Sequence, residues 1–142
     1  MADLLPTSIQ LQIVTPDREI ADAEVEEVSI PGKEGDLGVL PGHAPLLTEL
    51  RHGTLEYRQG GKRHYVAIHW GFAEVLSNRV IVLADLAERA EEIDIGRAES
   101  KRQSIEEYLK SHPGSDDPEI EKARDDLRRA ICRVETAHHA RG

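Results

Sequence analysis

Residues 34–50, EGDLGVLPGHAPLLTEL, gather the side chains of this chain that are best suited to chemistry. They include the acids Glu34 and Asp36 and one imidazole, His43. Glycines and prolines between them permit a tight backbone path and stiffen it. Such a segment could cradle an anion, hold a metal ion, or present a rigid contact surface to a partner.

The spacing of residues argues against the first two of these roles. The stretch GKEGDLG lacks the G-x-x-x-x-G-K-[ST] spacing of a phosphate loop. The seven histidines are scattered, and no spacing unites them with other metal ligands. We find no Ser-His-Asp or Cys-His arrangement, and the single cysteine, Cys132, is expected to be inert. The sequence therefore predicts no metal site and no catalytic residue. It leaves the segment as either a rigid contact loop or a corner shaped only by packing.

A second set of charged residues lies toward the carboxyl end. Arg129 and Arg133 are four residues apart, so on a helix they share one face and repel each other. Nearby acids, Asp125 and Asp126, could offset this repulsion on an ordinary solvated face. Upstream, the stretch IDIGRA at residues 93–98 is typical of a helix start with an acid in its first turn.

The elements that must position these residues change character along the chain. From residue 8 to about residue 84, apolar residues alternate with polar ones, as in SIQLQIV, where Ile9, Leu11 and Ile13 share one face. Turns are expected at residues 59–62 and 77–79. Short strands with closely spaced turns predict an antiparallel sandwich or barrel. Aromatic residues make up only 4% of the chain, so the core should be aliphatic, with Tyr57, Tyr65, Trp70 and Phe72 as its few large side chains.

From about residue 86 the sequence favours helix. A loop is expected at residues 111–118, where Asp117 is a good N-cap and Pro118 suits the first helical position. The second helix carries an alanine-rich seam at steps of three and four, formed by Ile120, Ala123, Leu127, Ala130, Val134 and Ala137. The two helices should form an antiparallel hairpin. Because the seam is narrow, we expect weak docking onto the strands and a hairpin that can move.

The composition limits the possible partners. The chain has 142 residues, enough for one ordinary domain or two small ones. Its net charge of −9 argues against a broad surface for nucleic acid or anionic lipid. One cysteine fits a reducing compartment. The amino terminus does not resemble a signal peptide, and no stretch is apolar enough to span a membrane, so a membrane role would come only through a partner.

The order of these pieces resembles a known family. A strand-rich half carrying EGDLGVLPGHAPLLT, then VIVLADLAERAEEID, then an alanine-rich helical hairpin, is similar to the epsilon subunit of bacterial and chloroplast F-type ATP synthases, called delta in mitochondria. The resemblance covers essentially the whole chain. It implies an α+β fold with a ten-stranded antiparallel β-sandwich at residues 1–86 and an antiparallel two-helix hairpin at residues 87–142. It also implies a subunit without an active site, because catalysis belongs to the alpha and beta subunits.

The resemblance further implies a place on the rotor. Family members link the gamma subunit to the ring of c subunits and so couple proton flow to ATP synthesis. Glu34, Asp36 and His43 would contact these rotor partners, and a rigid segment there would transmit torque without elastic loss. The expected location is peripheral, on the cytoplasmic face of the bacterial inner membrane, through the complex alone.

The resemblance assigns regulation to the hairpin, which restrains ATP hydrolysis when it extends into the catalytic head. Contact with the alpha and beta subunits would then come from the basic residues Lys122, Arg124, Arg128, Arg129 and Arg133.

Some family members bind ATP as a regulatory ligand on the folded-down hairpin, and none requires a cofactor. The residues that match their site are Glu88, Ile93, Asp94, Arg97, Ala98, Arg129 and Arg133, while Ser104 departs from a basic position. In an antiparallel hairpin the start of the first helix lies beside the end of the second. Three guanidiniums there could grip a phosphate.

A second interpretation needs no rotor. The same architecture could serve as a free-standing protein-interaction adaptor, and co-purification of gamma would separate the two. An enzyme is the third interpretation, and no constellation of residues supports it.

Overall fold

The computed structural model of the chain describes residues 5–114 and 116–142. Residues 1–4, at the amino terminus where no signal peptide is expected, and residue 115, in the expected loop between helices, lie outside it. The elements, in order, are β1 (Ile9–Val14), β2 (Glu19–Val25), β3 (Glu27–Gly32), β4 (Gly35–Val39), β5 (Leu46–Leu50), β6 (Gly53–Gln59), β7 (Lys62–Val75), β8 (Arg79–Arg89), η1 (Ala90–Glu92), α1 (Ile95–Lys110) and α2 (Pro118–Arg141).

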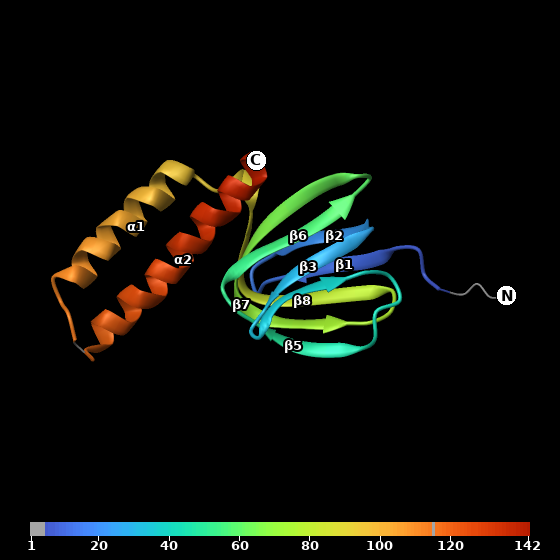
Figure 1. Cartoon of the computed structure of the whole chain (residues 1–142), viewed down its shortest axis with the longest axis horizontal. Helices are drawn as coiled ribbons and strands as arrows, with labels where there is room; N and C mark the ends of the chain where they lie inside the picture. Colours follow the sequence, from blue (N-terminus) through green and yellow to red (C-terminus); the bar gives the residue numbers. More distant parts are fainter. Residues whose placement is uncertain (1–4, 115) are drawn as a thin grey trace.

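The strands form an amino-terminal β-sandwich and the two helices stand beside it (Figure 1). Neighbouring strands follow the order β2-β1-β8-β7-β5-β3-β4, and β6 pairs with both β3 and β7. The pairs are antiparallel as predicted, except that β1 and β8 run parallel. The predicted class, strands first and helices second, is confirmed.

Within the described residues the sandwich has eight strands rather than the expected ten. The difference arises because β7 and β8 are long, with 14 and 11 residues. β7 pairs with β6 up to Ile68 and with β5 from Gly71 onward, so one strand serves two neighbours. At the junction Trp70 has a positive φ of 64°, which bends the strand. A Cβ on Gly71 would lie 2.2 Å from the carbonyl oxygen of Leu83, so only glycine fits there.

The core is aliphatic, as the composition predicts. Ile9, Leu11 and Ile13 of β1 are fully buried, which confirms the alternation in SIQLQIV. The prediction is wrong for two of the four aromatic residues expected in the core, because Trp70 and Phe72 are exposed on the outer face of β7. Beyond the bend in β7, they face away from the interior.

Residues 34–50 do not form one loop. They contain β4 and β5, joined by a tight path through residues 40–45. Glu34 precedes β4 and His43 follows it, so the two residues lie at opposite ends of that strand and the expected single tip does not exist. The physical reason is backbone pairing, since β4 pairs with β3 from Gly35 to Val39.

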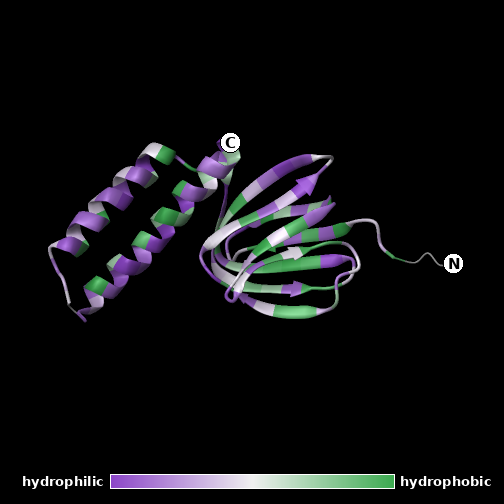
Figure 2. Cartoon of the chain, viewed as in Figure 1, coloured by the Kyte–Doolittle hydropathy of each residue, from purple (hydrophilic) through white to green (hydrophobic). Residues whose placement is uncertain are grey.

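The helical half begins later than the sequence predicts. Residues 86–89 continue β8 because they pair with β7, from His69↔Leu86 to Val66↔Arg89, and this pairing overrides their helix propensity. α2 begins as expected, with Asp117 as N-cap and Pro118 in the first turn. Figure 2 shows both helices as mostly hydrophilic, with hydrophobic residues recurring at intervals along α2. Neither helix of the described chain is long and apolar enough to cross a membrane.

Candidate functional site

α2 packs on the face of the sandwich formed by β6 and β7, and the apolar part of this contact is small. Its buried members are Ala67, Ile93, Cys132 and Ala137, with Ile95 packed beside them. At roughly 25 cal/mol per Å² of apolar surface, such small side chains hold the hairpin with little hydrophobic free energy. Polar contacts must therefore decide much of the docking.

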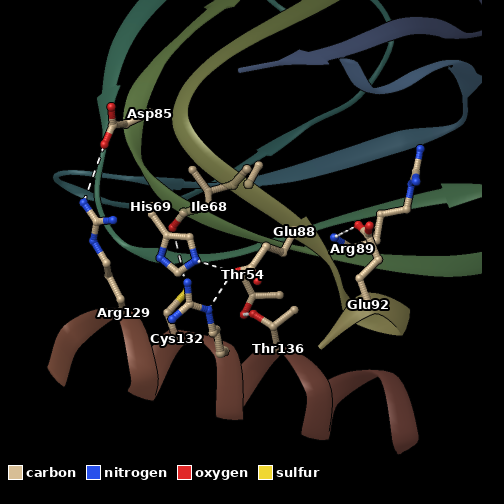
Figure 3. Close-up of polar contacts among 12 residues, drawn as sticks. Thr54, Ile68, His69, Asp85, Glu88, Arg89, Glu92, Arg129, Cys132 and Thr136 are labelled. Carbon is tan, nitrogen blue, oxygen red and sulfur yellow. Dashed lines mark hydrogen bonds and ion pairs between the residues drawn. The ribbon is translucent and has the colours of Figure 1, made fainter. Parts of the chain in front are cut away.

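Two polar contacts lie at the centre of this interface (Figure 3). The hydroxyls of Thr54 and Thr136 are 2.7 Å apart, and one donates to the other. The Cys132 thiol donates to the carbonyl oxygen of Gly53, with sulfur and oxygen 3.3 Å apart. Burial raises the pKa of Cys132 to about 11, so the thiol is inert, as expected.

Glu88 of β8 joins the sandwich to α2 (Figure 3). Its Oε1 lies 3.1 Å from Nε2 of the fully buried His69 and accepts from Nε of Arg133 at 2.7 Å. The hydrogen bond to His69, followed by that from Arg133, lowers the pKa of Glu88 to about 2. The carboxylate is therefore ionised, and Nε2 of His69 must be the donor.

Arg129 has different partners. Its guanidinium lies 3.5 Å from Asp85 of β8 (Figure 3). It also lies 3.2 Å from Asp125 of α2. Nε2 of His52 lies 3.3 Å from the other oxygen of Asp125. Arg129 and Arg133 thus each face their own carboxylate, which offsets the expected repulsion between them.

A cavity of about 300 Å³ opens where α1 begins. It is lined by Glu88, Glu92, Ile93, Asp94, Arg97, Ala98, Lys101, Ala130 and Arg133. These include every residue predicted for the nucleotide site except Arg129, which points toward Asp85. Lys101 was missed, although it stands one turn before Ser104, the position at which the family motif departs. This volume is at the lower end of the range of small-molecule sites.

The charges in this cavity are not all paired. Asp94 is the N-cap of α1, and its Oδ1 accepts from the backbone N–H of Arg97 at 3.1 Å. The side chains of Arg97 and Lys101 are exposed and have no hydrogen bond or ion pair with any described residue. They lie four residues apart on one helix, so their like charges favour an anion between them. The cavity could thus hold a phosphorylated ligand.

The other three basic residues predicted to contact the alpha and beta subunits, Lys122, Arg124 and Arg128, form no ion pair with the described part of the sandwich. Lys122 pairs with Asp126 at 3.0 Å, and Arg124 pairs with Glu121. Arg128 is exposed and has no ion pair with a described residue. Docking therefore does not tie these three side chains to the sandwich.

The three predicted rotor-contact residues are separated. Glu34 is exposed in the turn between β3 and β4, and Asp36 forms an ion pair with Arg51. His43 lies beyond β4, where its Nδ1 is 2.7 Å from the carbonyl oxygen of Ala44. Glu34 and Asp36 are exposed and His43 is partly exposed, so each remains available for contact.

An exposed apolar patch lies on the outer face of β1, β8 and the second half of β7. We define it by Val14, Trp70, Phe72 and Leu83, of which the last three are 44%, 43% and 57% exposed. Phe72 is opposite Leu83, Leu83 is opposite Val14, and the rings of Trp70 and Phe72 are 5.3 Å apart. Contiguous apolar surface of this kind marks an interaction site.

The sequence held a signal for the docking face that the periodicity argument passed over. Residues 66–69, VAIH, are all buried, because Val66 and Ile68 face the core while Ala67 and His69 face α2. A strand without polar alternation indicates cover on both faces. No comparable signal identified Thr54, Asp85 or the apolar patch.

Comparisons with known proteins agree with this architecture. Residues 8–90 match the family described as "ATP synthase, Delta/Epsilon chain, beta-sandwich domain". The ATP synthase epsilon chain of Solibacter usitatus is 47% identical over 134 residues, covering 94% of this chain and 98% of the relative. That of Desulforamulus reducens is 44% identical over 128 residues, covering 90% and 96%. A chain of the Euglena gracilis mitochondrial ATP synthase superposes with a TM-score of 0.80 at 26% identity, covering 98% of this chain and 86% of that one. The chain therefore belongs to the family of ATP synthase epsilon chains, which are non-catalytic subunits of that complex.

Proposed function

We propose that this chain is the central-stalk subunit of a bacterial F-type ATP synthase, which links gamma to the c-ring and couples proton flow to ATP synthesis. The observation that carries the proposal is a relationship that spans both halves of the chain, at 47% identity over 94% of its length. A general adaptor would not require this family's sandwich and hairpin together. The subunit needs no cofactor, and it reaches the cytoplasmic face of the inner membrane only through the complex.

The rotor contacts of this subunit are the apolar patch together with Glu34, Asp36 and His43. The patch supplies exposed apolar surface, and polar residues commonly form the rim of such interfaces. Charge reversal at Asp36 combined with His43→Ala should weaken binding to gamma in a pull-down from reconstituted complex. Wild-type binding by this double variant would remove these residues from the interface.

The hairpin restrains hydrolysis when it leaves the sandwich. In the docked state Asp85 and Glu88 hold Arg129 and Arg133, so release would free both guanidiniums for acidic surface on the alpha and beta subunits. Lys122, Arg124 and Arg128 extend the same basic helix.

The test compares reconstituted enzyme carrying the full chain with enzyme carrying a chain that ends after residue 92. Hydrolysis should be faster with the truncated chain, and synthesis should be retained. If the two enzymes hydrolysed ATP at equal rates, both at low and at high ATP concentration, the restraint would be excluded.

The cavity at the start of α1 binds ATP as a regulatory ligand and favours the docked hairpin. Arg97, Lys101 and Arg133 surround the place for phosphate, and Arg133 would exchange part of its contact with Glu88 for the ligand. Since only the docked hairpin forms the cavity, ATP should shift the population toward it.

Titration calorimetry on the full chain tests this site. Arg97→Ala and Lys101→Ala should each weaken ATP binding, because each removes a cation that no described residue pairs. Arg124→Ala is the matched control and should bind normally, since Arg124 lies outside the cavity and pairs with Glu121 of its own helix. No heat with millimolar ATP, or equal loss in the control, would overturn the assignment.

A further inference from the structure

Two histidines face each other across the buried contact between sandwich and hairpin. The ring centroids of His52 and His69 are 5.7 Å apart. The side chain of His69 is fully buried and that of His52 is 18% exposed. Nδ1 of each ring is buried and has no hydrogen-bond partner among the described residues. Neither histidine has a role in the functions proposed above.

We propose that His52 and His69 form a proton-operated latch, in which the docked hairpin requires neutral imidazoles and proton uptake releases it. The docking itself is a property of the isolated chain. Only the consequence for the enzyme rests on the proposed function of the hairpin.

The carboxylates that face the two histidines give little stabilisation to an imidazolium, because each already contacts an arginine. His52 faces Asp125, which Arg129 of α2 already contacts, and His69 faces Glu88, which Arg133 already contacts. Each carboxylate that faces a histidine is therefore already paired with an arginine. The other charged groups near these rings are Asp85 of β8, which is half exposed and pairs with Arg129, and Arg51, Arg128 and Glu135, which line an opening beside His52.

Protonation would place two unfavourable features in this interface. The added proton on Nδ1 would be a buried donor without an acceptor. Two imidazolium rings at this separation would also repel each other. Burial, and then the neighbouring His69, lower the pKa of His52 despite the opposing effect of Asp125.

The sign of the pH dependence follows from these features. When the hairpin is released, His52 of the sandwich is exposed to water and titrates near its ordinary value of about 6.5. The docked state binds fewer protons than the released state, so docking is strongest above that value and weakens as the pH falls below it. Acidification of the surrounding compartment would therefore move the hairpin toward the pose that restrains hydrolysis.

The chain contains its own probe of this equilibrium. Cys132 is its only cysteine, and its thiol is buried in the same interface. The rate of its alkylation by a maleimide is measured in the folded full-length chain and in urea-unfolded chain at the same pH. Protection is the unfolded rate divided by the folded rate, a ratio in which the titration of the thiol cancels. We expect constant protection between about pH 7.5 and 8. Below about pH 6.5 protection should fall by up to about tenfold per pH unit for each proton taken up.

Substitutions then assign the protons. The double variant His52→Gln with His69→Gln keeps amide donors for the two carboxylates and cannot bind the protons, so its protection should not change between pH 5 and 8. His112→Gln is the matched control, because His112 stacks on Tyr108 at the far end of the hairpin, and it should behave as wild type. The latch is excluded if wild-type protection is independent of pH, or if the double variant responds as wild type does.

If the double variant is unprotected even at pH 8, nuclear magnetic resonance of the wild-type imidazole Cε1–H groups decides. Their signals should remain those of neutral rings until Cys132 loses protection. Titration of both rings while Cys132 stays protected would overturn the proposal. All these measurements use the isolated chain, so a working latch combined with unaltered hydrolysis would contradict only the proposed role of the hairpin.

Discussion

At the scale of single residues, Glu88 is the group on which docking depends most. One carboxylate oxygen accepts from both His69 and Arg133, and so it joins β7, β8 and α2. Glu88→Gln would remove the charge from both hydrogen bonds and leave Arg133 without its partner. Hydrogen bonds to charged groups contribute about 1.5–3 kcal/mol. The protection of Cys132 from alkylation at pH 8 should therefore fall by about 10- to 100-fold.

Glu106→Gln provides the control for this prediction. Glu106 is half exposed on α1 and pairs with Arg102 at 3.5 Å, outside the interface. Exposed pairs of this kind contribute about 0–1 kcal/mol, so protection should change by less than about fivefold. Equal losses in the two variants would mean that Glu88 has no special role.

Glu88 should give docking a second pH dependence, at lower pH than that of the histidines. The pKa of Glu88 is about 2 in the docked chain, below the ordinary glutamate value of 4.5. His69 belongs to the sandwich, so only the part of this lowering that comes from Arg133 of α2 depends on docking. That part stabilises docking above pH 4.5 and is lost as the pH falls from 4.5 toward 2. Hydrogen exchange of the β7 amides at residues 67–69, corrected for intrinsic rates, should accelerate in this window in the wild type. Glu88→Gln should lack this step, and its presence there would assign it to another carboxylate.

Residue spacing predicted which residues of α1 line the cavity. It did not predict the direction of Arg129, which depends on the rotation of α2 about its axis. Arg97 and Ala98 follow Asp94 on the first turns of α1, so local geometry alone places them at the cavity. Arg129 differs, because its direction depends on how α2 is rotated against β8. That rotation comes from packing of Cys132 and Thr136 on the sandwich, which no spacing rule within the helix contains.

At the scale of elements, period two identified the strands that have one face in the core, such as β1. It missed β4 because its five residues, GDLGV, include two glycines and little alternation. It ended β8 too early because residues 86–89 have helix propensity, and only their pairing with β7 keeps them extended. Pairing between distant segments is nonlocal information, so the sequence pattern indicated where strands begin more reliably than where they end.

The bend in β7 yields a stability prediction. Gly71 lies where the strand changes partners, and an added Cβ would lie 2.8 Å from Cα of Ala84 as well as against the Leu83 carbonyl. Both obstacles are backbone, so Gly71→Ala should cost about 3 kcal/mol through forced backbone shifts. Urea unfolding followed by circular dichroism would measure this as a lower midpoint. Gly38→Ala is the control, because no atom lies within 4 Å of its new Cβ, and its midpoint should not fall.

At the scale of the whole molecule, the hairpin and the apolar patch give the chain two different kinds of surface. The hairpin rests on the sandwich through a few small side chains and several ion pairs, which suits a contact that can be released. The patch is apolar and has no cover from the described chain, which suits a lasting contact with another subunit. The family resemblance predicted both behaviours, but the sequence alone did not locate the patch, since an apolar residue on the outer face of a strand looks like a core residue.

Phe72→Glu combined with Leu83→Glu should therefore disrupt assembly without unfolding the chain. Both side chains are already exposed, so the thermal midpoint of the isolated subunit should change little. Affinity for gamma should fall about 30-fold or more, because charge at the centre of an apolar interface removes contacts of about 2 kcal/mol or above. Surface-immobilised gamma and titrated subunit would give the two dissociation constants. Tyr108→Glu makes the same kind of change on α1, away from the patch, and should leave affinity for gamma intact. If the double variant bound gamma as tightly as wild type, the patch would have to serve another partner, and the c-ring would be the next to test.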